Sequence, residues 1–404
     1  MGRVDDIARR YLLLGLRLER WMPRFVDSYI GPAELAEVVG GEQLIPLASL
    51  HDEALALQDL ALSLPADDAP QQRRRDWFEA QLRAISALAR QAAGEEIDYL
   101  DLVEQLFDLR VGTVPDERLA DARRRMDDAL PGQGSLSERH AAFTAATRVP
   151  PRRVLRAVKD STGRFRAVAQ RDFEVPEPEG IDWDVVRDQP WGAEARFRGS
   201  GRTLIRINLD LPHEVASIAF LASHEGYPGH HLDHITREQT LVRQAGLGEA
   251  TLRTMNTPES LLSEGLADVA REVVMSDLEL GAELRAIARG VGVSSSLEAA
   301  VPVWRARMEL GGAIGNAAIL LHQRGLPAEQ VRDYLLETTV EPRPVVDHLL
   351  RTLQDPIGRT YPFTYTDGAR IIRAWLEVIG QTTGFARLLA EQHTPSRLVA
   401  EAAV

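Results

Sequence analysis

The chain has 404 residues, 44% of them hydrophobic, and a formal net charge of −13 at pH 7. This length and composition fit a globular protein with a sizeable core, and the negative charge argues against nucleic acid or an anionic membrane as the main partner, since both require clustered positive charge. The chain has no cysteine, which excludes disulfides, thiolate metal ligands and a cysteine nucleophile, so any metal must be bound by His, Asp or Glu.

Residues 1–172 are predicted to form a succession of amphipathic helices, because apolar residues recur at spacings of three and four. The chain begins with MGRVDDIARRYLLLGLRLERW, in which acids and arginines stand where a secretory signal would have an uninterrupted apolar core. No run of about 18 apolar residues follows, and a membrane-spanning helix is therefore not expected. These features predict a soluble cytoplasmic protein that acts away from membranes.

Residues 173–190 are expected to form a linker or crossover, because the segment FEVPEPEGIDWD is rich in proline and acid. Residues 191–404 begin with a predicted hairpin: in AEARFRGSGRTLIRINLDLP, two strands flank a turn at residues 199–201. A helix is predicted to begin near Pro212, and another at Pro258 with Thr257 as its N-cap.

The rest of the chain is predicted to be helical, with breaks at TTVEPRP and DPIGRTYPFTYTDG. Together these elements predict a mainly α fold with a small antiparallel β-hairpin or sheet next to the helix that begins near Pro212. Residues 191–404 are expected to pack with the N-terminal helices as one compact unit.

The most informative stretch is HEGYPGHH, residues 224–231. It starts like the H-E-x-x-H motif of zinc proteases, in which two histidines one helical turn apart bind the metal and the glutamate activates a water molecule. Here Pro228 occupies the position of the second histidine. In an unbroken helix His224 and His231 would stand about 10.5 Å apart along the axis, which is too far for both to bind one metal ion.

Pro228 and Gly229 predict a break in that helix, because proline has no N–H to donate to the preceding turn and glycine adopts conformations closed to other residues. A π-type bulge of two residues would restore the one-turn relation between His224 and His230. We therefore expect His230 as the second metal ligand and His231 as a second-sphere or substrate-facing catalytic group. The opposite assignment of these two histidines stays open.

A third ligand is expected from a glutamate on the following helix, as in thermolysin-like sites, which keep one coordination position for water. The segment SEGLADVA supplies Glu264, and Asp268 lies four residues later on the same helix face, where it can orient a ligand histidine. The predicted ligands of one zinc ion per chain are thus His224, His230 and Glu264, although cobalt, manganese or iron would accept a similar set.

The motifs HEGYPGHH and SEGLADVA resemble domain-of-unknown-function family 885, a branch of the gluzincin metallopeptidases. The segments LLGLRLERWMPRFVDSYIGP and RTYPFTYTDG are also similar to family segments. The resemblance implies a gluzincin-like helical fold in which the strand LIRINLDL, containing Asn208, is the edge strand that binds an extended peptide. It also implies a late tyrosine that donates a hydrogen bond to the developing oxyanion. Tyr365 is the candidate and Tyr361 a substrate contact, with packing anchors as the alternative role for both.

The resulting hypothesis is a zinc-dependent hydrolase, foremost a peptidase acting on short peptides. The metal would lower the pKa of its water, and Glu225 would take the proton and pass it to the leaving amine. Arg370 or Arg373 would bind a substrate carboxylate. The alternatives are a metal-dependent hydrolase of another amide or small metabolite, and a non-catalytic helical binding protein stabilised by metal.

Overall fold

The computed structural model describes residues 5–189 and 191–403. The protein is mainly helical with two small sheets, which confirms the predicted fold class. The helices before the three-stranded sheet are α1 (Asp6–Glu19), α2 (Ala33–Gly41), α3 (Leu47–Leu62), α4 (Ala69–Ala92), α5 (Tyr99–Phe107), α6 (Asp116–Ala129), α7 (Leu136–Ala146) and α8 (Pro151–Ala169). The α-helices after it are α9 (Val215–Leu221), α10 (His230–Arg237), α11 (Pro258–Val274), α12 (Asp277–Val291), α13 (Ala300–Leu310), α14 (Gly312–His322), α15 (Ala328–Thr339), α16 (Arg343–Gln354), α17 (Pro362–Ile379), α18 (Gln381–Ala390) and α19 (Pro395–Ala402).

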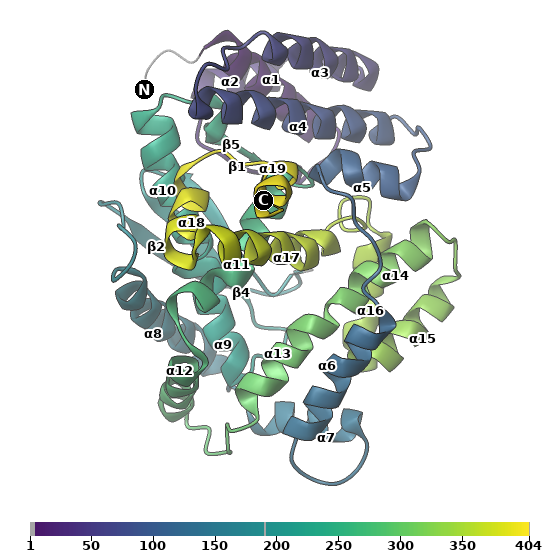
Figure 1. Cartoon of the computed structure of the whole chain (residues 1–404), viewed down its shortest axis with the longest axis vertical. Coiled ribbons are helices and arrows are strands. Elements are labelled where there is room, and N and C mark those ends of the chain that lie inside the picture. Colours follow the sequence, from purple (N-terminus) through teal and green to yellow (C-terminus); the bar gives the residue numbers. More distant parts are fainter. Residues whose placement is uncertain (1–4, 190, 404) are drawn as a thin grey trace.

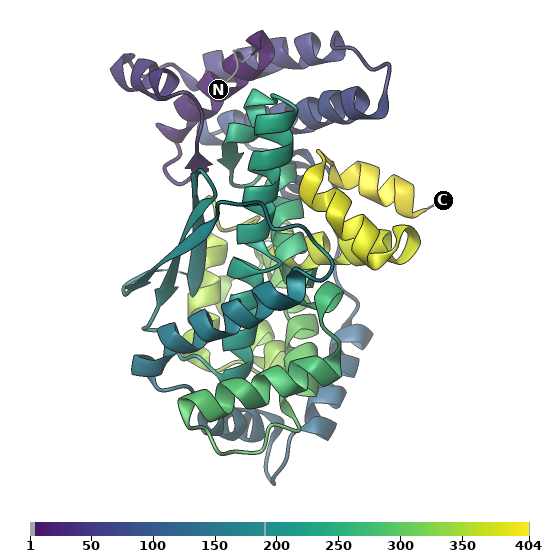
Figure 2. The ribbon, with the colours of Figure 1, turned by 90° about the vertical axis from the view of Figure 1, so that its left-hand side faces the viewer.

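The helices are arranged around a central pair, α11 and α17, which pack against each other in the middle of the molecule (Figure 1). Helices α1 to α4 close one end of the long axis, while α6, α7 and α12 lie towards the other end (Figure 1). Figure 2 shows the three-stranded sheet on one side of the molecule and the C-terminal helices α18 and α19 on the opposite side. The main core contains buried side chains from Ile7 to Leu398, so both ends of the chain contribute to one core.

The three-stranded sheet differs from the prediction in two ways. Its strands are β2 (Gly180–Val186), β3 (Ala193–Gly199) and β4 (Arg202–Asn208), in the order β2-β4-β3. The predicted antiparallel hairpin is present as β3 and β4. However, β2 pairs in parallel with β4, so residues 180–186 of the segment expected to be a linker, 173–190, form a strand. Residue 190, at the predicted end of that segment, lies outside the described residues. Because β4 is central, the edge strands are β2 and β3.

The other sheet pairs β1 (Val26–Tyr29) with β5 (Leu252–Thr254) in antiparallel orientation. Its pairing is irregular between Val26 and Ser28, which places Asp27 at a β-bulge. A bulge inserts one extra residue into a strand and changes the direction of its side chain. This small sheet links the N-terminal helices to the segment immediately before α11.

Two glycines allow the central helices to approach closely. A Cβ atom added at Gly265 of α11 would lie 2.3 Å from the carbonyl carbon of Gly368 in α17, and one added at Gly368 would lie 2.5 Å from the carbonyl oxygen of Leu261. Contacts this short are excluded for real side chains. Only glycine at both positions lets the two backbones meet, directly beside Glu264.

The predicted start of α11 is confirmed, since Thr257 accepts a hydrogen bond from the backbone N–H of Ser260 and Pro258 is the first helical residue. The predicted break at DPIGRTYPFTYTDG is too long, because α17 begins at Pro362; proline is favoured in the first turn of a helix. Tyr365 and Arg370 therefore lie on a helix. Among the described residues, no helix combines the length and the apolarity needed to cross a membrane.

Candidate metal centre

The histidine motif is distorted as its sequence predicts. Helix α9 continues into a π-helical turn, η1 (Ala222–Gly226), whose C-cap is Tyr227. Helix α10 begins at His230. The peptide bond between Tyr227 and Pro228 is cis. A Cβ at Gly229 would lie 2.0 Å from the carbonyl oxygen of His224, so only glycine fits at the point where the chain turns back. The break brings the imidazole rings of His224 and His230 to a centroid distance of 4.7 Å.

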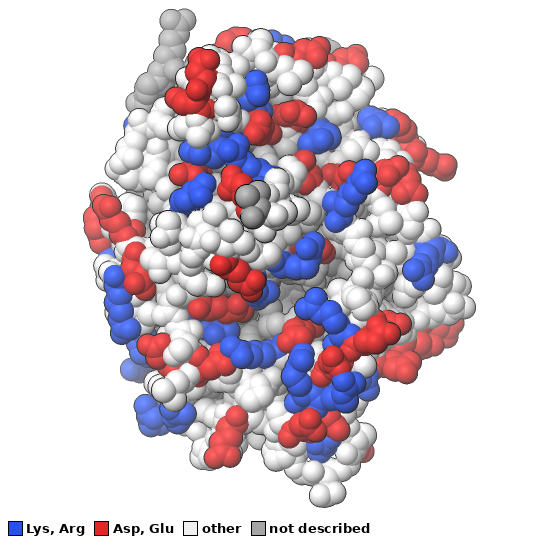
Figure 3. All heavy atoms as spheres, in the orientation of Figure 1, with Lys and Arg blue, Asp and Glu red and all other residues white. Residues whose placement is uncertain are grey.

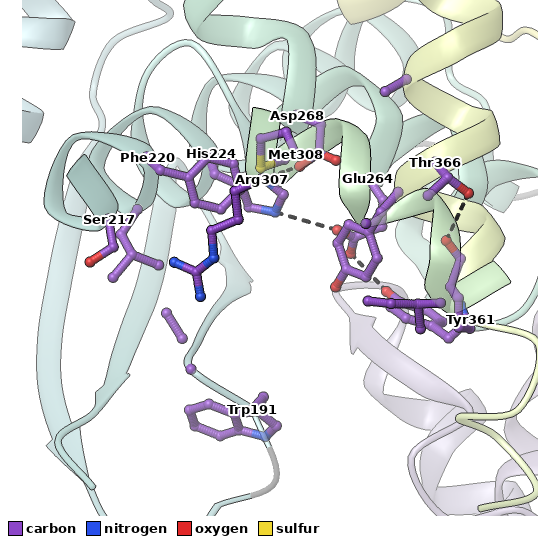
Figure 4. A pocket seen from close by; sticks show the side chains of 18 of the residues that line it. Trp191, Ser217, Phe220, His224, Glu264, Asp268, Arg307, Met308, Tyr361 and Thr366 are labelled. Atoms are coloured by element: carbon purple, nitrogen blue, oxygen red, sulfur yellow. Dashed lines mark hydrogen bonds and ion pairs between the residues drawn. The ribbon is translucent and has the colours of Figure 1, made fainter. Parts of the chain in front are cut away.

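Three side chains, two from the histidine motif and one from α11, converge at one point. The Glu264 Oε2 atom lies 3.3 Å from Nε2 of His224 and 3.7 Å from Nε2 of His230, and one ligand atom from each residue lies within 4.8 Å of the others. Tetrahedral ligands about 2.0–2.2 Å from a zinc ion are separated by about 3.5 Å. The observed spacing fits such a set. Figure 4 shows His224 and Glu264 facing each other in the wall of one cavity.

Each ligand histidine is held through its other ring nitrogen. Asp268 Oδ1 lies 3.1 Å from Nδ1 of His224, and the hydroxyl oxygen of Ser263 lies 3.3 Å from Nδ1 of His230. Ser263 in turn contacts Asp233 at 3.3 Å and receives a 2.7 Å hydrogen bond from Arg253. Such partners fix the tautomer and orientation of metal-binding imidazoles.

The charges of the site make it attractive to a cation. Burial opposes the charge on His224, but its close contacts with the acids Asp268 and Glu264 outweigh burial and raise its pKa well above the usual value. Burial likewise opposes ionisation of Glu264, yet His230 and His224 lower its pKa well below the usual value. Glu264 Oε2 is also a buried acceptor that lacks a hydrogen-bond donor. The Glu264 carboxylate oxygen faces two imidazole nitrogens, and a second acid, Asp268, lies behind His224. This set has the donor chemistry that zinc prefers.

Glu225 and the two tyrosines lie beside the three ligands. Glu225 is 5% exposed and lines the cavity; burial raises its pKa, although His224 and His230 act in the opposite direction. Tyr361 donates a 2.7 Å hydrogen bond to Oε1 of Glu264 (Figure 4), so it supports a ligand and does not extend freely towards a substrate. Tyr365 lines the cavity, and burial with the nearby acids Glu264 and Asp268 raises its pKa well above the usual value.

Two predicted site residues lie elsewhere. His231 is fully buried. Its Nδ1 lies 2.7 Å from the hydroxyl oxygen of Thr203, and its Nε2 lies 3.1 Å from Oε2 of Glu179. It therefore anchors the sheet, and the expectation of a substrate-facing group was wrong. Asn208 is also fully buried, and its amide donates to the carbonyl oxygens of Gln189 and Trp191. Its predicted role in substrate binding is corrected to a structural one, because β4 is the central strand.

Arg370 and Arg373 line the cavity but are paired with acids. Arg370 contacts Asp367 at 2.9 Å, one turn earlier on α17, and Arg373 contacts Glu272 at 2.8 Å. Neither guanidinium is in contact with the proposed ligands. A substrate carboxylate would have to compete with these partners.

The candidate metal centre opens into a cavity of about 1720 Å³. Trp191 and Arg307 line its wall across from Tyr361 (Figure 4). The edge strand β3 contributes Ala193, Glu194 and Ala195. On the face shown in Figure 3, acidic and basic side chains are intermixed around a hollow near the middle. The site is therefore accessible from outside while its ligands are buried.

Several residues of the site were missed by sequence reasoning. Ser263 directly precedes Glu264, and Asp233 follows His230 by three residues, so helical spacing alone could have indicated both. Asp27 and Arg253 come from the small β1–β5 sheet, and no local signal in the sequence connects them to the motif.

No protein-family model and no curated protein sequence matches the chain. Among solved structures it is similar to a candidate lipoprotein from Colwellia psychrerythraea, with a TM-score of 0.57 and 14% identity over 91% of this chain and 68% of that chain. It is also similar to a candidate lipoprotein of unknown function from Shewanella oneidensis, with a TM-score of 0.50 and 11% identity over 90% of this chain and 75% of that chain. At these identities the similarity concerns the fold alone.

Proposed function

We propose that the protein is a zinc-dependent hydrolase that acts on short peptides. The observation that supports this most is the convergence of His224, His230 and Glu264 within 4.8 Å, in the wall of a cavity that Glu225 also lines. Zinc held by these three residues would supply a Lewis acid and lower the pKa of a water molecule. The resemblance of HEGYPGHH and SEGLADVA to gluzincin-like proteins points to the same chemistry.

The chain's own residues would then divide the proton transfers. Glu225 accepts the proton of the attacking water. Its raised pKa suits this role, because a general base works best when its pKa is close to the pH at which the enzyme acts. It returns that proton to the leaving amine. Tyr365 keeps its own proton, since its pKa is raised well above the usual value, and donates a hydrogen bond to the developing oxyanion.

The cavity favours a peptide over a small metabolite. Its volume of about 1720 Å³ exceeds the roughly 300–1,000 Å³ of most small-molecule sites. The edge strand β3 lines it, and an edge strand can pair with the main chain of an extended peptide. We include in this proposal a cytoplasmic location and the absence of nucleic-acid or membrane partners, both expected from the sequence.

Digestion of a peptide library by the zinc-loaded protein tests the proposal, with Glu225→Gln as the variant. We expect cleavage of short peptides, and loss of several orders of magnitude in turnover in the variant with zinc still bound. If no peptide is cleaved, hydrolysis of another amide becomes the better hypothesis. If the variant retains the full function of the wild-type protein, the protein is a metal-stabilised binding protein.

A further inference from the structure

Asp27 is an acidic residue that the proposed mechanism does not use. It lies at the bulge of β1, is partly buried and lines the cavity of the candidate metal centre. Burial raises its pKa, against the charges of Arg253 and His230, and Asp27 in turn helps to raise the pKa of Tyr361. In the β1–β5 sheet Asp27 stands between Val26 and Ser28, which pair with Thr254 and Arg253. Arg253 contacts Ser263, the residue before Glu264, so Asp27 lies on the side of the cavity from which α11 starts.

Arg253, on the strand that pairs with β1, already contacts other acids. Arg253 contacts Asp233 at 3.1 Å, Ser263 at 2.7 Å and Glu259 at 3.5 Å. Among the described residues, no hydrogen bond or ion pair to the side chain of Asp27 is found. A partly buried carboxylate without a partner costs free energy, so a cationic group next to Asp27 would be stabilised.

Two arginines of the cavity, in contrast, are paired with acids. Arg307 contacts Glu341 at 2.6 Å and Glu214 at 3.4 Å, and Arg271 contacts Asp277 at 3.4 Å. At Arg307 and Arg271 an anionic substrate group would have to displace these acids, whereas a cation can bind Asp27 directly. Charge complementarity therefore selects for a substrate with a positive group near the scissile bond.

We propose that Asp27 binds the α-ammonium group of a peptide substrate, and that the protein removes residues from the amino terminus of short peptides. This inference rests on the proposed hydrolase function. In an aminopeptidase the ammonium nitrogen is two bonds from the carbonyl carbon that is attacked, so its carboxylate partner must line the same cavity as the metal ligands, as Asp27 does. Glu194 lines the cavity on the neighbouring edge strand β3 and adds negative charge near Asp27.

The test compares trialanine amide with N-acetyl-trialanine amide, which lacks the ammonium charge. Both peptides are titrated into zinc-loaded protein in the Glu225→Gln background, so that binding is measured without turnover, and are then digested by the protein with Glu225 intact. We expect the free-amine peptide to bind and to be cleaved about 10- to 100-fold better than the acetylated one, the range of a hydrogen bond between charged groups. Asp27→Asn should remove this preference and leave the acetylated peptide unaffected.

Glu377→Gln is the matched control, because Glu377 is an exposed acid on the last turn of α17 that also lines the cavity. It should keep the preference for the free amine. Equal binding of the two peptides, no binding of either, or an unchanged preference in Asp27→Asn would overturn the inference. Preferential binding that depends on Asp27 without any cleavage would support the ammonium site at Asp27 and contradict the hydrolase proposal, so the two failures are distinguishable.

Discussion

Replacing Gly265 by alanine tests whether the crossing of α11 and α17 assembles the candidate site. The new Cβ would lie 2.3 Å from the carbonyl carbon of Gly368, 2.7 Å from its oxygen and 2.8 Å from the nitrogen of Ala369. All three atoms belong to the backbone of α17, so no side chain can rotate away. Since carbon atoms pack at about 3.5–4.0 Å, the two helices must separate by about 1 Å.

The expected cost follows from two opposing effects. Overpacking of a tight interface costs about 1–3 kcal/mol, while alanine in place of glycine stabilises a helix by about 1 kcal/mol. We therefore expect a net loss of up to about 2 kcal/mol in the free energy of unfolding. Because Tyr361 stands at the start of α17 and binds Glu264 at 2.7 Å, moving α17 should also lower zinc affinity by about tenfold.

Gly163→Ala is the control, because Gly163 lies in α8 and a Cβ there would meet no atom within 4 Å. It should stabilise the protein by up to about 1 kcal/mol and leave zinc affinity unchanged. Urea unfolding measures the stability of both variants, and competition with a chromophoric chelator measures zinc affinity. If Gly265→Ala matches the wild-type protein in both measurements, the helix crossing does not position the ligands as argued.

Asp268→Asn and Ser263→Ala should each lower zinc affinity by about 10- to 100-fold, because each removes a partner of a ligand histidine; wild-type affinity in a competition titration would exclude that role. Tyr365→Phe should lower kcat for peptide cleavage by about 10²- to 10³-fold with little change in KM, and an unchanged kcat would show that its hydroxyl does not assist. Burial opposes the charge of Glu179, but hydrogen bonds, foremost the one with His231, lower the pKa of Glu179 from 4.5 to about 2. Glu179 therefore contributes stability above pH 4.5 that is lost as the pH falls towards 2, so the unfolding free energies of the wild-type protein and Glu179→Gln should approach each other below about pH 3. A difference between them that is constant from pH 7 to pH 2.5 would contradict this linkage.

The local features of the site could be predicted because they depend on neighbouring residues. Pro228 in place of a histidine indicates a break, and the one-turn relation of His224 to His230 follows if the break is a bulge. The structure has a π-helical turn at residues 222–226. The helix from Pro258, which carries Glu264, was equally visible from its N-cap.

The errors concern contacts between distant segments. His231 follows His230 on one helix, so once His230 faces the ligand cluster, His231 must point elsewhere; the partner that receives it, Glu179, lies in a segment whose prolines suggested a linker. The parallel pairing of β2 with β4 joins strands about 20 residues apart and makes β4 central. A pattern of alternating residues cannot distinguish a central strand from an edge strand when its partner is not recognised.

The most direct test of the metal centre is elemental analysis of the purified protein combined with an anomalous-scattering map at the zinc edge. We predict one zinc ion per chain, with His224, His230 and Glu264 as its protein ligands. Folded protein crystals soaked in zinc that show no anomalous peak between these three side chains would contradict the account.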